Sequence, residues 1–229
     1  MNTIVAYPDN LSFSNGKYHH SSDNYKQTNT FSNLNEFDSL SQKDTLIYLV
    51  PSSIISSYVF ENNQNLSKQN NLANFISDID SFIVDDISKN EFFIFNENSF
   101  VINKTLYEEL NTMLNTLNCK ILVLPDYFLN RQFGKDTITE FNNKFLFSFK
   151  NGTGSSIEHD SLNQYIETVK INYPDFDPII YCDSDVKDLK TFKIRKKFNI
   201  SDFVKNCLLY TSDAADEGLG VDLGGRRII

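Results

Sequence analysis

The chain has only three histidines, which limits the catalytic triads and zinc sites that it could form. A Ser–His–Asp triad requires a histidine, and many zinc sites use histidine as a ligand. His19 and His20 are adjacent and precede two serines, and His159 lies between two acidic residues. Histidines in such polar stretches are typical of solvated surface positions. We therefore expect all three to be exposed, and we predict no catalytic residue and no metal centre.

Aspartates gather in two stretches, and paired carboxylates are able to hold a divalent metal or to act as acid and base. Neither stretch has the spacing of an EF-hand loop, and neither supplies the two carboxylates and one histidine of a metal hydrolase. We predict a solvated acidic face for each. The residues are Asp78, Asp80, Asp85 and Asp86 in the first stretch and Asp183, Asp185 and Asp188 in the second.

One glycine-rich loop, Asn-Gly-Thr-Gly-Ser-Ser at residues 151–156, is the remaining candidate for chemistry. A phosphate-binding P-loop needs a lysine and a hydroxyl after its glycines, and this loop has no lysine there. It follows the apolar run 144–149, so the pattern favours a hairpin turn in which glycine supplies a positive φ. We predict no bound cofactor.

Composition and charge exclude several classes of protein. The chain has 229 residues, 21 Lys+Arg against 30 Asp+Glu, a net charge of −9 and a pI near 4.8. An acidic balance removes the attraction on which nonspecific nucleic-acid binding depends, so no nucleic-acid partner is expected.

The N-terminus has no basic segment followed by an apolar one, and no long apolar run occurs, so the chain is predicted to be soluble and unexported. Three separated cysteines (Cys119, Cys182 and Cys207) fit the reduced thiols of a cytosol.

Apolar runs of strand length alternate with two helical patterns. The helices are expected at 72–83 and 104–117, where apolar residues recur every three or four positions. Helix 104–117 leads at once into the apolar run 120–124, which predicts a strand buried on both faces and an α/β or α+β fold. At most a strand pair at 11–18 is expected before residue 45, and no internal repeat is visible. The remaining strands are expected at 45–50, 54–60, 91–95, 99–102, 144–149 and 178–181.

The last 23 residues differ in composition from the rest of the chain. Asparagine and phenylalanine are absent after Asn206, whereas four of the eight glycines lie between 218 and 225. We interpret residues 1–206 as the domain and residues 207–229 as a non-native read-through tail, with the natural continuation missing. A genuine flexible tail is the alternative.

Three sequence blocks follow one another between residues 45 and 157. The first is an apolar strand ending in Val50-Pro51, then a second strand and a helix that runs into Val84-Asp85-Asp86. The second is helix 104–117 with a strand closing on Leu124-Pro125-Asp126-Tyr127. The third is the strand, glycine turn and strand of 145–157. Together they resemble the cytoplasmic region of type II secretion system protein L.

The resemblance implies an α/β, actin-like or RNase-H-like domain with a mixed central sheet and two lobes. It implies a non-enzymatic scaffold on the cytoplasmic side of the bacterial inner membrane, held there by a transmembrane helix beyond residue 206. The implied partners are the N-terminal domain of the secretion ATPase (protein E), protein M and a second copy of the chain. A basic stretch expected beside the bilayer, or on a solvated face, comprises Lys190, Lys193, Arg195, Lys196 and Lys197.

The partner-binding residues are expected to be Asp80, Asp85 and Asp86, because acidic side chains steer a basic partner. The helix before them departs from the resembled pattern, which carries a Glu and Gln pair where this chain has Asp80, Ser81 and Phe82. Two alternatives stay open. One is an active actin-like ATPase that uses loop 151–156 for phosphate and the aspartates for Mg²⁺; the other is a type IV pilus assembly homologue with a different partner.

Overall fold

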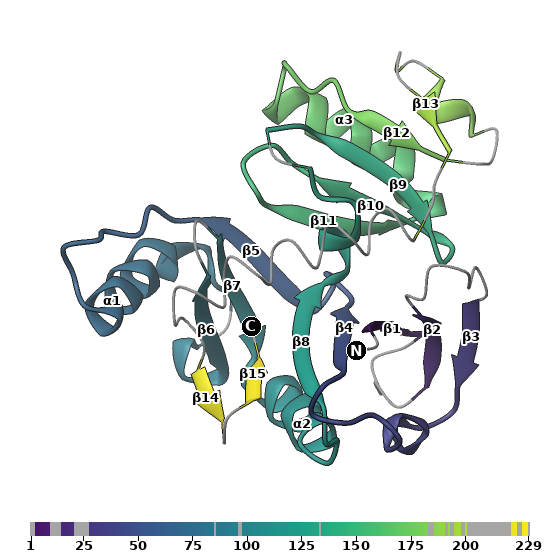
Figure 1. Ribbon diagram of the computed structural model, residues 1–229. Coiled ribbons are helices and arrows are strands. Elements are labelled where there is room, and N and C mark those ends of the chain that lie inside the picture. The colour runs from purple at the N-terminus through teal and green to yellow at the C-terminus, as the bar shows by residue number, and fades with distance from the viewer. Residues whose placement is uncertain are drawn as a thin grey trace. The chain divides into compact units, whose positions relative to one another are not determined.

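The structure is a computed structural model that divides the chain into two compact units (Figure 1). Unit 1 comprises Met1–Pro125 with Ala214–Ile229, and unit 2 comprises Asp126–Asp213. The described residues are 3–9, 15–20, 28–84, 86–95, 98–132, 134–182, 186–190, 192, 195–197, 200, 221–223 and 226–228. Residues 207–220 lie outside them, so the proposed boundary at residue 206 stays a prediction. The short strands β14 (Val221–Leu223) and β15 (Arg226–Ile228) pair antiparallel.

A five-stranded mixed sheet forms the centre of unit 1. Its strand order is β3-β2-β1-β4-β8, in which β1 pairs antiparallel with β2 and parallel with β4, and β4 pairs parallel with β8. The parallel strands carry continuous apolar runs, as expected for strands covered on both sides. The bounds are β1 Thr3–Pro8, β2 Gly16–His20, β3 Thr28–Phe31, β4 Thr45–Val50 and β8 Lys120–Pro125.

Both faces of this sheet are apolar and buried, which confirms the prediction for residues 120–124. Helix α2 (Lys104–Leu114) packs Leu110 and Leu114 on one face, against Leu46 and Ile121. On the opposite face the alternate residues are equally inaccessible: Val5, Ile47, Leu49, Leu122 and Leu124. The period of two along each strand produces this division of the side chains.

The segment between β4 and α2 forms an additional layer, a second sheet with its own covering helix. Its three strands have the order β5-β7-β6 and are antiparallel, with bounds β5 Ile55–Val59, β6 Asn90–Phe95 and β7 Asn98–Asn103. Helix α1 (Lys68–Ile79) covers one face through Phe75, whose ring centroid lies 6.4 Å from that of Phe92. On the other face Phe93 contacts Tyr107 of α2, at 5.2 Å between ring centroids.

Unit 2 repeats the topology of the first sheet. Its strands have the order β11-β10-β9-β12-β13, again with two antiparallel pairs followed by two parallel pairs. Helix α3 (Leu162–Asn172) buries Leu162, Ile166 and Val169 against Phe145 and Phe147. The bounds are β9 Thr137–Phe141, β10 Lys144–Ser148, β11 Gly154–Glu158, β12 Ile179–Tyr181 and β13 Arg195–Lys196. The chain thus contains a structural repeat that its sequence does not reveal.

Several boundaries differ from the sequence expectation. The first helix begins four residues earlier, at Lys68, because the Ser67 hydroxyl caps it by accepting from the Asn70 N–H at 3.2 Å. It ends at Ile79 rather than residue 83, and the second ends at Leu114 rather than 117. Short 3₁₀ segments are η1 Leu34–Phe37, η2 Asp80–Phe82, η3 Ile87–Lys89, η4 Asp126–Asn130, η5 His159–Ser161 and η6 Lys187–Leu189. Over the described residues, no helix combines the length and apolar character required to cross a bilayer.

Candidate partner-binding surface

The predicted acidic residues lie in the connection from α1 to β6. Asp80 follows the last residue of α1 and begins η2, and its side chain is exposed. Ile79 before it is buried against Phe75, so the end of the helix is fixed by the core of the additional layer. The Ile83 N–H donates to the Asp80 carbonyl at 3.4 Å and closes the turn. The sequence pattern had placed Asp80 inside a helix ending at residue 83, whereas the structure places it in the turn that follows α1.

Asp86 is exposed and caps the next short helix, η3. Its Oδ1 accepts the backbone N–H of Ser88 at 2.9 Å, and its carbonyl accepts from the Lys89 N–H at 2.9 Å. The Ser88 backbone N–H, its hydroxyl and the Lys89 charge favour the carboxylate and hold the pKa of Asp86 below its ordinary value. Asp86 is thus a fixed negative charge. Asp85, the third predicted residue, lies outside the described residues.

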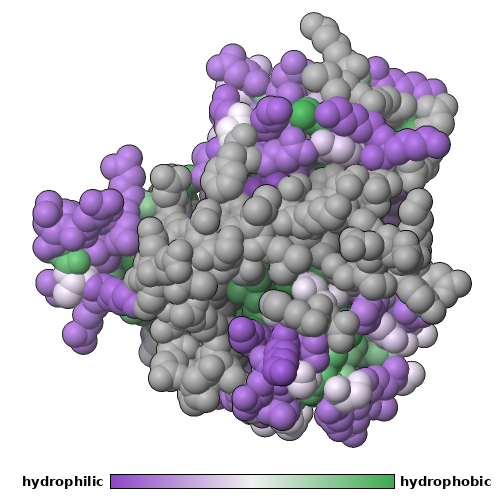
Figure 2. Space-filling view, in the orientation of Figure 1, coloured by the Kyte–Doolittle hydropathy of each residue, from purple (hydrophilic) through white to green (hydrophobic). Residues whose placement is uncertain are grey.

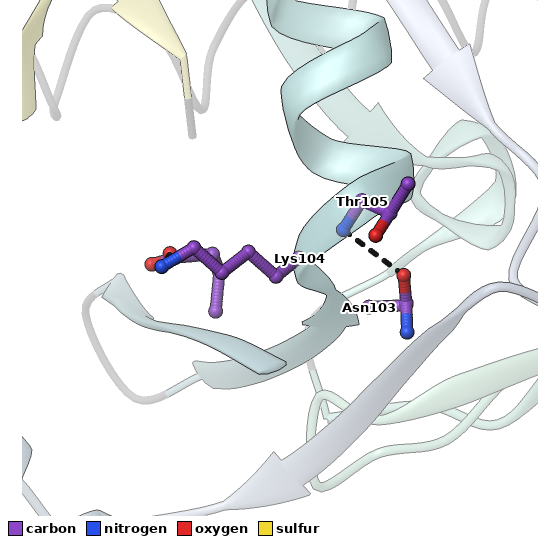
Figure 3. A network of polar contacts seen from close by, with 4 residues as sticks. Asn103, Lys104 and Thr105 are labelled. Carbon is purple, nitrogen blue, oxygen red and sulfur yellow. Dashed lines mark hydrogen bonds and ion pairs between the residues drawn. The ribbon is translucent and has the colours of Figure 1, made fainter. Parts of the chain in front are cut away.

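Hydrogen bonds connect Asp86 to the start of α2. The Asn90 side-chain amide donates to the Asp86 carbonyl at 3.1 Å, and Asn90 is the register partner of Asn103. Asn103 Oδ1 accepts the N–H of Thr105 at 3.0 Å, which caps α2 (Figure 3). Lys104, the first residue of α2, also places its Nζ 3.6 Å from Glu91 Oε1 of β6. The connection is therefore attached to a capped helix and a paired strand.

Two exposed apolar side chains, Phe82 and Val84, lie between Asp80 and Asp86, and the sequence pattern did not predict their exposure. Phe82 is 70% exposed and Val84 is 103% exposed, whereas Ile83 between them packs against Phe75 in the core of the layer. Around α1 the surface in Figure 2 is mostly hydrophilic, so exposed apolar groups are unusual there. The apolar spacing of α1 continues through Ile83 in the sequence, so the end of the helix at Ile79 is not visible there.

The histidines only partly agree with the prediction of exposed positions. His19 is 1% exposed, and this corrects the expectation of a surface pair. His19 and His20 lie on a strand, so they point to opposite faces, and His19 shares the buried face with its register partner Val5. Burial and the adjacent His20 lower the pKa of His19. His159 is exposed as predicted, and its Nε2 lies 3.7 Å from Glu140 Oε1.

The glycine-rich loop is the predicted hairpin turn between β10 and β11. Gly152 has φ 92°, and its N–H donates to the Phe149 carbonyl at 2.9 Å. Asn151 Oδ1 accepts both the N–H of Thr153, at 3.1 Å, and the Thr153 hydroxyl, at 2.8 Å. The Phe149 N–H in turn donates to the Thr153 carbonyl. These N–H groups are used within the turn, so they are not available to surround a phosphate.

The other polar candidates do not assemble into a reactive site in the part of the chain that is described. No cluster of three or more His, Cys, Asp and Glu side chains there has the geometry of a metal site. Cys119 is buried, and Cys182 donates its S–H to Glu140 Oε2 at 2.9 Å. Asp183, Asp185 and Cys207 lie outside the described residues.

The fold of the chain is similar to that of two solved structures. The cytoplasmic domain of EpsL, an inner membrane component of the type II secretion system of Vibrio cholerae, superposes with TM-score 0.67 and 11% identity, covering 91% of this chain and 95% of that one. A Bacteroides thetaiotaomicron protein with an actin-like ATPase fold and unknown function gives 0.51 and 10% identity, with the same coverage.

The chain has the actin-like fold. This confirms the predicted fold class, and the predicted likeness to the cytoplasmic region of a protein L is confirmed at the level of the fold. The sequence matches no family profile and no curated protein. At 11% identity the actin-like fold is the extent of what the likeness establishes.

Proposed function

We propose that this chain is the cytoplasmic scaffold of a type II secretion system, in the role of protein L, and that it recruits the secretion ATPase without hydrolysing nucleotide. One observation carries the proposal: the likeness to the EpsL cytoplasmic domain extends over 91% of this chain and 95% of that domain. A match of that extent includes both units rather than one common sheet motif. Fold alone does not imply function, so the site must supply the rest.

The surface between α1 and β6 supports a binding role. It presents the exposed carboxylate of Asp80 and the fixed charge of Asp86 around Phe82 and Val84. Apolar groups within a charged rim are the usual composition of a protein interface. The ATPase alternative loses its proposed phosphate loop, because the N–H groups of Gly152 and Thr153 already donate within the hairpin turn.

The proposed location is the cytoplasmic side of the inner membrane. EpsL is an inner membrane component, and we assign this chain the same place, joined to the bilayer by a segment beyond residue 206 and paired there with protein M. Lys190, Lys196 and Lys197 are exposed and suit a position facing anionic lipid. Lys193 lies outside the described residues. A homodimer is part of the proposal.

Co-expression with the N-terminal domain of the secretion ATPase from the same genome tests the proposal. We expect the two to co-elute from a sizing column, whereas the corresponding domain of a pilus ATPase does not. Purified chain is expected to show no saturable nucleotide binding and no ATP hydrolysis above a blank. Absence of co-elution contradicts the scaffold role, pilus-domain binding favours the pilus homologue, and saturable hydrolysis favours the ATPase.

A further inference from the structure

Phe82 and Val84 form an exposed apolar pair whose position is fixed by their neighbour. Ile83 has φ −86° and ψ 124°, an extended conformation, and its side chain packs in the core beside Phe75. Phe82 is the last residue of η2 and Val84 follows Ile83, and neither shares the buried environment of the Ile83 side chain. Their exposures, 70% and 103%, agree with this.

Backbone hydrogen bonds hold the chain on both sides of the pair. On the N-terminal side, Ile83 N–H donates to the Asp80 carbonyl, and on the C-terminal side Lys89 N–H donates to that of Asp86. A partner that binds such a fixed surface loses less conformational freedom than one that must order a loop. Phenylalanine supplies a large apolar area with few rotatable bonds, which suits the centre of an interface.

The charges around the pair determine which partner fits. Asp80 precedes Phe82 by two residues and Asp86 follows Val84 by two, and both carboxylates are exposed. Asp86 remains ionised because Ser88 and Lys89 stabilise its carboxylate. A segment that covers the apolar pair must therefore bring positive charge next to its own apolar side chains. The whole chain, at net charge −9, favours the same partner.

We propose that Phe82 and Val84 are the apolar anchors of the docking surface and that the partner presents a basic amphipathic segment to them. The inference rests on the proposed function, because it specifies the part of the partner that the acidic connection binds. Asp80 and Asp86 then set the approach and orientation of the partner, while the apolar pair sets how long the complex lasts. The surface is defined by these four residues alone.

Surface plasmon resonance with the complete chain tests this assignment, using the N-terminal domain of the secretion ATPase as the first probe. Phe82→Ser and Val84→Ser are each expected to weaken binding by roughly tenfold or more, mainly through faster dissociation. Val59→Ser and Ile171→Ser are matched controls, because these residues are 57% and 79% exposed elsewhere. All four sites are exposed, so melting temperatures should stay close to that of the wild type.

A second probe, an amphipathic helical peptide of lysine and leucine, separates this inference from the proposed function. We expect the peptide to bind the wild type and the control variants, and to bind Phe82→Ser and Val84→Ser at least roughly tenfold more weakly. If the ATPase domain fails to bind but the peptide shows this pattern, the proposed function is wrong and the docking surface stands. Tight ATPase-domain binding that neither substitution alters by more than twofold overturns the inference, as does peptide binding that is equal in all variants. Self-association of the wild type that both substitutions abolish also overturns it, because the surface then binds a second copy.

Discussion

The α-carbon of Gly154 lies against the ring of Tyr127, with no room for a Cβ atom between them. Gly154 begins β11 and Tyr127 belongs to η4, so the contact fixes this 3₁₀ segment on one face of the second repeated sheet. The Phe147 carbonyl closes the same space from the paired strand. Asn130 secures η4 further along, where its amide donates to the Leu146 carbonyl at 2.9 Å.

Substituting Gly154 with alanine should destabilise unit 2. The added methyl group meets a fully buried ring and a strand backbone, neither of which moves easily, and overpacking of this kind costs about 1–3 kcal/mol. Thermal unfolding of Gly154→Ala, Tyr127→Ala and the double variant measures the effect. If the contact is responsible, the alanine at 154 costs less when Tyr127 is already truncated. Equal costs in both backgrounds would show that strand conformation is the cause.

Asn71 should be the most sensitive polar residue of α1. It is 4% exposed, its Oδ1 accepts the Asn63 N–H at 2.9 Å, and its amide donates back to the Asn63 carbonyl at 2.9 Å. Asn71→Leu leaves these backbone groups without partners, at a cost of about 1–3 kcal/mol. Chemical denaturation is the measurement, and Asn74→Leu, at an exposed position of the same helix, is the control. Comparable losses at both positions would contradict the role assigned to Asn71.

Buried His19 should make stability depend on pH. Burial, and then the charge of His20, lower its pKa below the ordinary value of 6.5. As the pH decreases, His19 is therefore protonated in the unfolded chain before it is protonated in the folded one. Its effect on the free energy of unfolding is constant well above pH 6.5, and the free energy of unfolding falls as the pH decreases through 6.5 toward the pKa of the folded state. Urea titrations between pH 5 and pH 8 should show this fall in wild type and in His20→Asn, with a smaller slope in His19→Asn. A slope that survives in His19→Asn would assign the effect to other groups.

Charge changes at Asp80 and Asp86 should slow association with the proposed ATPase partner. Asp80→Lys reverses an exposed charge, and Asp86→Asn removes a charge while keeping an oxygen that is able to cap η3. Both should lower the association rate at low ionic strength, and the difference should shrink as salt screens the charges. Asp175→Lys, at an exposed position in unit 2, is the matched control. Unchanged association rates at low salt would place the basic partner elsewhere.

The fold was predictable from sequence where apolar patterns are continuous. Residues 120–124 read as a strand buried on both faces because Ile121 to Leu124 are all aliphatic, and β8 has that environment. The strand β1 is also apolar but was missed, because this short run near the start of the chain has turn residues on one side only, at Pro8-Asp9-Asn10. Helix α3 was missed despite the helical spacing of Leu162, Ile166 and Val169, because Asn163, Gln164 and Asn172 gave the stretch a polar composition.

The candidate site was predictable only in part. The exposure of Asp80 and Asp86 could be expected from the sequence, because aspartate side chains are rarely buried. The exposure of Phe82 and Val84 could not be expected, since it depends on α1 ending at Ile79, whereas Ile83 continues the helical spacing in the sequence. His19 was misread because its burial requires β2 to pair with β1, a contact between separate segments.

The most direct test of the central claim is a calorimetric titration of the complete chain with the N-terminal domain of the secretion ATPase from the same genome. The scaffold role predicts saturable binding with defined stoichiometry, little change when ATP is added, and loss of affinity in Phe82→Ser. No heat of binding at concentrations up to the solubility limit, together with saturable binding of ATP itself, would contradict the scaffold role and identify a nucleotide-binding protein.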